Sequence, residues 1–209
     1  ITDINGLKIA VLNYTYGTNG LTVTPPTMVN IIDTNYIKRA ILKARSKGAH
    51  FVIPVMHWGL EYQNQGSEHQ RKMAQFLADV GCDAIIGMHP HVVQPIKNIR
   101  TKDGRNVPVA FSLGNFVSNQ RDRYKNGGIL ARVKILHRGN EIKLVQMDYK
   151  PFWVHKLLPN DTYPPFTKRG YYLLPQENLH LLKEKYKSEA DIFFQDTREL
   201  LDGVPEWKN

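Results

Sequence analysis

Apolar residues gather in short runs along the first half of the chain, and amphipathic stretches separate these runs. Short continuous runs rich in branched aliphatic residues are typical of buried β-strands. Four of them precede Gly114: Leu7–Tyr14, His50–Met56, Asp83–Met88 and Val107–Leu113. Strands of this kind belong to the interior of a sheet that is covered on both faces.

Helical patterns link these strands. In "NYIKRAILKARSK" the apolar Ile37 and Ile41 fall four residues apart, Asp33 or Thr34 can cap the start, and Gly48 can end the helix.

A second helix is expected from the capping-box pattern "SEHQ" at Ser67–Gln70 to about Val80, before Gly81. Helices between buried strands favour βαβ crossovers. The sequence therefore predicts an α/β fold with a mostly parallel sheet and flanking helices.

The pattern changes after Asn115. Alternating apolar and polar residues in "GGILARVKILHRGNEIKLVQMDY" predict an antiparallel hairpin that turns at "RGN". The proline- and aromatic-rich stretch 151–166 is expected to be an irregular wrapping segment, and the tail from Pro175 to Asp202 to carry one or two amphipathic helices. We accordingly divide the chain into residues 1–150 and 151–209.

Composition narrows the class of protein. The chain has 209 residues, 42% of them hydrophobic, which suits one sizeable domain or one domain with a small appendage. Its net charge of +9 favours an acidic partner. The single Cys82 excludes an internal disulfide, and no apolar run is long enough to span a membrane. Because the chain opens on Ile1 and enters a strand pattern at once, we expect it to be part of a longer protein.

Histidines follow two of the predicted strands. His57 comes directly after one strand, His89 and His91 follow the next, and Asn115 follows a third. In parallel sheets, ligands bind beyond the carboxyl ends of the strands. His89 and His91 are two residues apart, so in an extended segment both imidazoles would point to one side, as a metal ion or an anion requires. We expect His57, His89 and His91 to share one crevice.

Plainer explanations exist for each of these residues. His57 can be a strand-end histidine bonded to a backbone carbonyl, and Pro90 can make "HPH" a structural turn. Glu61 lies close enough to His57 in sequence to orient a metal ligand or to handle a proton. Ser67 is better explained as a helix cap and Cys82 as a packing residue. The remaining histidines have no such placement: His50, His69, His137, His155 and His180.

Four motifs in this order carry a resemblance: "YTYGTNG" (14–20), "HWGLEY" (57–62), "GMHPHVVQP" (87–95) and "SLGNF" (112–116). Over Leu7–Val117 the chain resembles the bacterial capsule-synthesis family of CapA type, which is linked to poly-γ-glutamate and related to calcineurin-like metallophosphoesterases. The resemblance implies part of a metallophosphatase-like layered fold and a two-metal centre of divalent ions such as Mn or Zn.

The same resemblance assigns residues to the centre. His57 and His89 would share one metal, and His91 would bind the other. The aspartate motif, bridging carboxylate and Asn-His pair of the wider superfamily do not occur before Tyr14. We therefore expect this chain to be the carboxyl-terminal part of the family domain, with an incomplete metal site.

The expected function is that of a metal-dependent hydrolase-like protein acting on an anionic surface polymer or a phosphate-containing substrate. Glu61 and Asn115 are the candidate catalytic residues. Substrate contacts are expected from residues of the motifs and of a basic loop: Tyr14, Asn19, Trp58, Arg121 and Arg123. Two basic segments, 97–105 and 121–125, should flank the crevice.

Two alternatives stay open: a non-catalytic scaffold that binds an acidic polymer, and a phosphoesterase acting on nucleotides or sugar phosphates. We do not expect nucleic acid as a partner, but we expect that the chain can self-associate. The resemblance implies an extracytoplasmic location, with membrane anchoring through a segment outside this chain.

Overall fold

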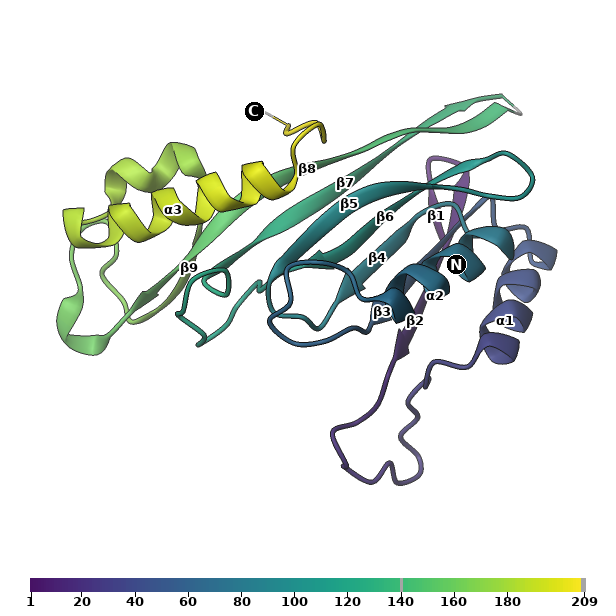
Figure 1. Cartoon of the computed structure of the whole chain (residues 1–209), viewed down its shortest axis with the longest axis horizontal. Coiled ribbons are helices and arrows are strands. Elements are labelled where there is room, and N and C mark those ends of the chain that lie inside the picture. Colours follow the sequence, from purple (N-terminus) through teal and green to yellow (C-terminus); the bar gives the residue numbers. More distant parts are fainter. Residues whose placement is uncertain (140, 208–209) are drawn as a thin grey trace.

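The computed structural model describes residues 1–139 and 141–207, and it contains two β-sheets with helices outside them (Figure 1). The larger sheet has the strand order β1-β2-β3-β4-β6-β5. Its strands are β1 (Thr2–Ile4), β2 (Leu7–Thr15), β3 (Phe51–His57), β4 (Ile85–Met88), β5 (Val93–Arg100) and β6 (Asn106–Leu113). The four central strands are parallel, and β1 and β5 are antiparallel edges. The predicted mostly parallel α/β sheet is confirmed.

Two helices cover one face of this sheet. Helix α1 (Thr34–Ser46) begins after Asp33, whose carboxylate accepts from the backbone N–H of Tyr36 at 2.6 Å. Helix α2 (Glu68–Asp79) begins after Ser67, which forms the predicted capping box with Gln70. The apolar sides of both helices pack on the sheet in one core. Both helices and their starting caps are confirmed.

The second sheet covers the opposite face. It consists of β7 (Gly127–Arg138), β8 (Glu141–Leu157) and β9 (Gly170–Leu174), and α3 (Glu184–Leu200) packs on it, preceded by the 3₁₀ helix Gln176–Leu181; another 3₁₀ helix spans Pro159–Asp161. The pairing of Arg138 with Glu141 confirms the hairpin, although Asn140 of the predicted turn lies outside the described residues. A second core of buried side chains joins the two sheets and α3. None of the described helices is both long and apolar enough to cross a membrane.

The expectation that residues 151–166 are irregular is wrong for 151–157. Strand β8 continues without a break past residue 150, the expected boundary between the two parts of the chain, and pairs with β9 as far as Leu157. Pro151 fits because Tyr149, two residues earlier, points its N–H away from β7 to the carbonyl of Pro205. Residue 151 faces the same way, so the N–H that proline lacks costs no bond to β7.

The basic segment 97–105 does not flank the crevice. Strand β5 turns back along β6, so that Val93 pairs with Leu113 and Arg100 with Asn106. The segment therefore reaches the amino ends of the parallel strands, where its residues line a cleft of about 590 Å³. The prediction failed because "VVQPIKNIR" contains a proline and charges that hide a strand.

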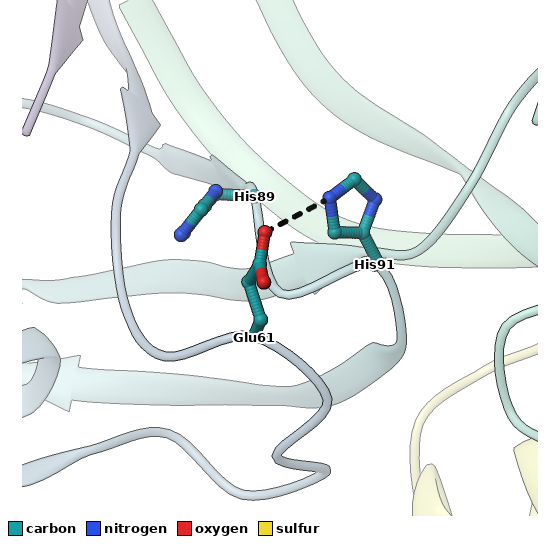
Figure 2. Close-up of side chains that lie close together, drawn as sticks. All are labelled: Glu61, His89 and His91. Atoms are coloured by element: carbon teal, nitrogen blue, oxygen red, sulfur yellow. Dashed lines mark ion pairs between the residues drawn. The ribbon is translucent and has the colours of Figure 1, made fainter. Parts of the chain in front are cut away.

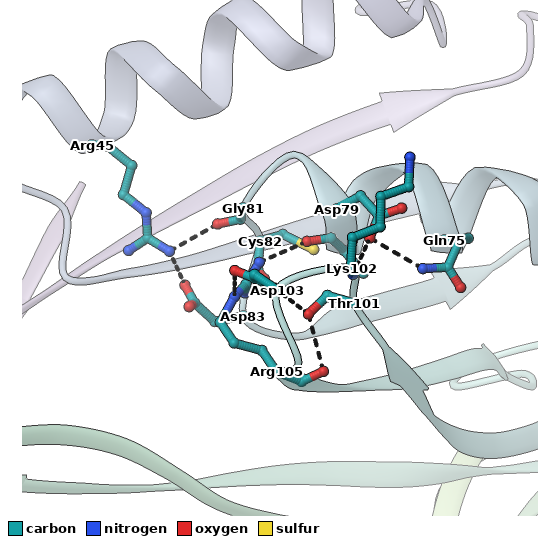
Figure 3. A network of polar contacts seen from close by, with 11 residues as sticks. Arg45, Gln75, Asp79, Gly81, Cys82, Asp83, Thr101, Lys102, Asp103 and Arg105 are labelled. Atoms are coloured by element: carbon teal, nitrogen blue, oxygen red, sulfur yellow. Dashed lines mark hydrogen bonds and ion pairs between the residues drawn. The ribbon is translucent and has the colours of Figure 1, made fainter.

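At these amino ends, two arginines bind the ends of both helices (Figure 3). Arg45, in the last turn of α1, donates to the carbonyl of Gly81 at 2.8 Å and pairs with Asp83 at 2.6 Å. Asp83 also accepts from the N–H of Val52 in β3 at 2.6 Å. Arg105 donates to two carbonyls at the carboxyl end of α2, at 2.9 and 3.0 Å. These bonds tie the last turn of α1, and Arg105 just before β6, to the end of α2 and the segment that follows it.

Candidate metal centre

The carboxyl ends of β3 and β4 bring the three predicted histidines together. The ring centres of His57 and His89 lie 4.7 Å apart, and those of His89 and His91 lie 6.0 Å apart. The predicted convergence of the three histidines at the carboxyl edge of the sheet is confirmed. The reason given for the pair is wrong, because His89 and His91 lie in a bend after β4 and not in an extended strand.

The backbone of this bend is unusual. His89 has φ 104°, His91 has φ 61°, and Tyr62, in the turn after β3, has φ 65°. Residues with a Cβ rarely adopt positive φ, and the conformation costs of the order of 1–3 kcal/mol each. The N–H of Tyr62 donates to the carbonyl of Pro90 at 2.8 Å, so the two turns hold each other. Strain of this kind concentrates where function requires it.

A carboxylate joins the histidines. Figure 2 shows Glu61 between the imidazoles of His89 and His91. One potential ligand atom from each of these three residues lies within 4.8 Å of the others. The distance from Nε2 of His91 to Oε1 of Glu61 is 3.6 Å. Imidazole nitrogen and carboxylate oxygen together form a donor set that suits zinc.

The hydrogen bonds of His91 direct its Nε2 toward Glu61. Asn115 donates from Nδ2 to the carbonyls of His91 at 3.1 Å and Lys125 at 2.7 Å, so its Oδ1 is the acceptor of the 2.9 Å bond to Nδ1 of His91. Nδ1 of His91 therefore carries a proton, and its Nε2 faces the carboxylate of Glu61, where a neutral ring can donate its lone pair to a metal ion.

His57 has the same arrangement. The hydroxyl of Thr15 donates to the carbonyl of Gly17 at 3.0 Å, so its oxygen accepts from Nδ1 of His57 at 3.0 Å. This leaves Nε2 of His57 with a lone pair. Metal-bound histidines usually donate their other N–H in this way. The residues present therefore fit a divalent ion.

Burial lowers the pKa of both His57 and His89 below the ordinary value. The neighbouring imidazoles lower these pKa values further, while Glu61 raises that of His89. Both rings are thus neutral at neutral pH, as ligands must be.

Comparison with known proteins gives the family. The sequence profile described as "Bacterial capsule synthesis protein PGA_cap" matches residues 1–120. The chain belongs to this family. It is 33% identical over 118 residues to "PGA biosynthesis protein CapA" of Bacillus subtilis (strain 168), and 33% identical over 123 residues to "Capsule biosynthesis protein CapA" of Bacillus anthracis. Each match covers 56% of this chain but only 30% and 29% of those proteins, so the chain spans less than a third of these relatives.

Among solved structures, the chain is similar to the 5'-nucleotidase precursor of Thermus thermophilus. The sequence identity is 16% and the TM-score 0.39, over 84% of this chain and 29% of that one. A similarity at this level supports no conclusion about activity.

Two predicted substrate contacts of this capsule-synthesis protein do not fit the structure. Trp58 is 0% exposed, and its Nε1 donates to the carbonyl of Phe111 at 3.0 Å. Tyr14 is 2% exposed, and burial raises its pKa to about 12. Both side chains lie in the core under the helices and support the site from below. Motif membership alone did not separate packing residues from exposed ones.

The two predicted arginines also bind the protein itself. Arg121 is half-buried and donates to the carbonyls of Ser118, Gln120 and Val154. Arg123 forms two bonds to Asp196 of α3, at 2.8 and 2.9 Å. The structure thus gives both guanidinium groups partners within the protein, and their contact with a substrate stays a prediction. The segment 121–125 still lies beside the crevice, because the carbonyl of Lys125 binds Asn115.

Tyr16 and Tyr62 at the crevice were missed. The Tyr16 ring lies 4.5 Å from that of His89 and 5.6 Å from that of His57, and its hydroxyl bonds to the predicted substrate residue Asn19. Tyr62 stacks beside His91 with the ring centres 5.9 Å apart. Both belong to the motifs "YTYGTNG" and "HWGLEY", which was the signal that could have identified them.

Proposed function

We propose that this chain carries a divalent-metal site of a capsule-synthesis protein that hydrolyses or trims an anionic surface polymer outside the cytoplasm. The observation that carries the proposal is the group of Glu61, His89 and His91, in which Nδ1 of His91 donates to Asn115 and its Nε2 faces the carboxylate of Glu61 at 3.6 Å. Anchoring to a membrane, through a segment outside this chain, is part of the same proposal.

The residues have distinct roles. Glu61, His89 and His91 would hold the ion, with His57 beside them as a further ligand. Imidazoles favour zinc over magnesium or manganese. When bound, such an ion supplies Lewis acidity, which polarises a carbonyl or phosphoryl group toward attack by water.

The other residues orient these ligands. Asn115 keeps the proton of His91 on Nδ1, and Thr15 does the same for His57. The Glu61 carboxylate is also placed to accept a proton from water. We assign Asn115 to positioning, because its side chain is directed at His91 and at backbone carbonyls.

The polymer is proposed from charge and from relatives. The net charge of +9 attracts a polyanion, and one relative is called a PGA biosynthesis protein. One observation favours the scaffold alternative. In the described part of the chain, only one group of three candidate metal ligands was found, and a hydrolytic site with two metal ions needs more ligands than three.

Calorimetric titration with zinc tests the site. Wild type should bind zinc, and His89→Ala should weaken binding by more than about 100-fold, since removing only an outer partner already costs about 10–100-fold. His69→Ala is the matched control, because His69 is exposed on α2. Equal zinc affinity in wild type and His89→Ala would overturn the proposed site.

Incubation with poly-γ-glutamate then tests the reaction. Shortening of the polymer by the zinc-loaded chain, but not by His89→Ala, supports hydrolysis. Binding without shortening supports the scaffold, and cleavage of an aryl phosphate ester alone supports the phosphoesterase. If the chain neither binds nor cleaves the polymer, the polymer assignment is refuted.

A further inference from the structure

Tyr62 stands at the edge of the proposed metal centre without a role in holding an ion. Its ring lies 27° from the plane of the His91 ring and is 47% exposed. Its positive φ and its backbone bond to Pro90 hold the side chain beside the histidines. A bulky residue in this conformation is costly, and a glycine or asparagine would make the same turn at lower cost.

The hydroxyl of Tyr62 belongs to the network that orients His91. Asn115 donates from Nδ2 to Oε1 of Gln120 at 3.1 Å, which fixes which end of the Gln120 amide is the acceptor. The other end, Nε2, then donates to the hydroxyl oxygen of Tyr62 at 3.2 Å. Since the oxygen is already an acceptor, the hydroxyl proton is left to donate outward. A ring that served only for stacking would not need this bond.

Positive charge lies against the same ring. Nζ of Lys125 is 4.4 Å from the centre of the Tyr62 ring, and its side chain is only 19% exposed. Asp122 pairs with this ammonium at 2.5 Å, and Glu61, the residue before Tyr62, is the carboxylate of the metal-ligand group. With a divalent ion beside Glu61, the surroundings of the hydroxyl favour an anion.

We infer that the Tyr62 hydroxyl donates a hydrogen bond to an oxyanion oxygen of the substrate bound at the metal centre. The ligand chemistry is a carboxylate or phosphate oxygen. The inference rests on the proposed metal site and adds to it a substrate-binding group. Lys125 and Gln120 act through Tyr62 as positioning residues.

Tyr62→Phe tests this, because phenylalanine keeps the stacking on His91 and removes only the hydroxyl. Zinc affinity is measured first, and then the affinity of the zinc-loaded chain for inorganic phosphate and for acetate, each by calorimetry. We expect unchanged zinc affinity and about a tenfold weaker affinity for at least one oxyanion, as loss of a hydrogen bond to a charged group predicts. Tyr171→Phe is the matched control, since its hydroxyl donates to Asn119 away from the histidines.

Each outcome separates the two proposals. If wild type fails to bind zinc, the proposed metal site is wrong and this inference falls with it. If zinc binds but Tyr62→Phe binds both oxyanions as wild type does, or wild type binds neither, the role of Tyr62 is refuted and the metal site stands. A loss of zinc affinity in Tyr62→Phe would make the hydroxyl part of the metal support and would also refute it. A loss confined to phosphate, or to acetate, supports the inference and names the oxyanion.

Discussion

Replacing Asn115 by alanine should damage both the stability of the fold and the metal site. The side chain is 7% exposed; its two Nδ2 hydrogens are shared among three acceptors, and its Oδ1 accepts one bond. A buried hydrogen bond contributes about 0.5–1.5 kcal/mol net, so the loss of the equivalent of three should lower the free energy of unfolding by about 1.5–4.5 kcal/mol. This is a large share of the roughly 5–15 kcal/mol of a typical domain.

The second effect follows from the proton of His91. Without Oδ1 of Asn115 as acceptor, Nδ1 loses its partner, and the ring can rotate or carry its proton on Nε2. Loss of such an outer partner typically weakens metal binding by about 10–100-fold. Urea denaturation measures the first effect, and zinc titration of the folded variant measures the second.

Asn30→Ala is the matched control. Asn30 is exposed and donates one side-chain bond to the carbonyl of Asn13, so its loss should change stability by no more than about 0.5 kcal/mol. If Asn115→Ala destabilises by less than about 1 kcal/mol, the bonds counted here contribute far less than buried hydrogen bonds do. If it keeps wild-type zinc affinity, Asn115 does not control the His91 proton.

Three further substitutions test other parts of the fold. Asp148 is buried, and its hydrogen bond with Arg132 lowers its pKa to about 2. The stability that this ion pair contributes is present above the unfolded pKa near 3.8 and is lost as the pH falls toward 2. Asp148→Asn should therefore make unfolding, monitored by circular dichroism, depend less on pH over that range, and an unchanged acid profile would contradict the assignment. Gly87→Ala would place a Cβ 2.0 Å from the carbonyl oxygen of Phe111, so we expect a loss of more than about 2 kcal/mol in urea unfolding, and a wild-type midpoint would refute the close approach. Ser67→Ala removes the capping box of α2 and should cost about 1 kcal/mol in the same assay, whereas no change would show that the cap is dispensable.

Local signals predicted most of the larger sheet. Apolar runs located β2, β3, β4 and β6, and Asp33 and Ser67 located the helix starts, because these features depend on residues close in sequence. Strand β5 was missed because Pro95 and charged residues obscure its pattern, and the end of β8 because Pro151 suggests a break.

The crevice itself was predictable only in part. Strand-end placement was enough to bring His57, His89 and His91 together. The partners that decide their protonation are Thr15 and Asn115, 42 and 24 residues away from His57 and His91. Such distant contacts have no local signal. The same holds for Arg123, whose partner Asp196 is 73 residues away.

The arginine contacts of Figure 3 lie at the amino ends of the parallel strands, whereas the histidines lie at the carboxyl ends. Substitutions that strengthen or weaken the hydrogen bonds and ion pairs of Arg45 and Arg105 thus act a full strand length away from the candidate metal ligands. The stability of the fold can therefore be altered at one end of the sheet while the contacts of the histidines at the other end stay unchanged. A thermostabilised variant for crystallisation is best sought among substitutions near Arg45 and Arg105, because these would leave the positions of the histidines unchanged.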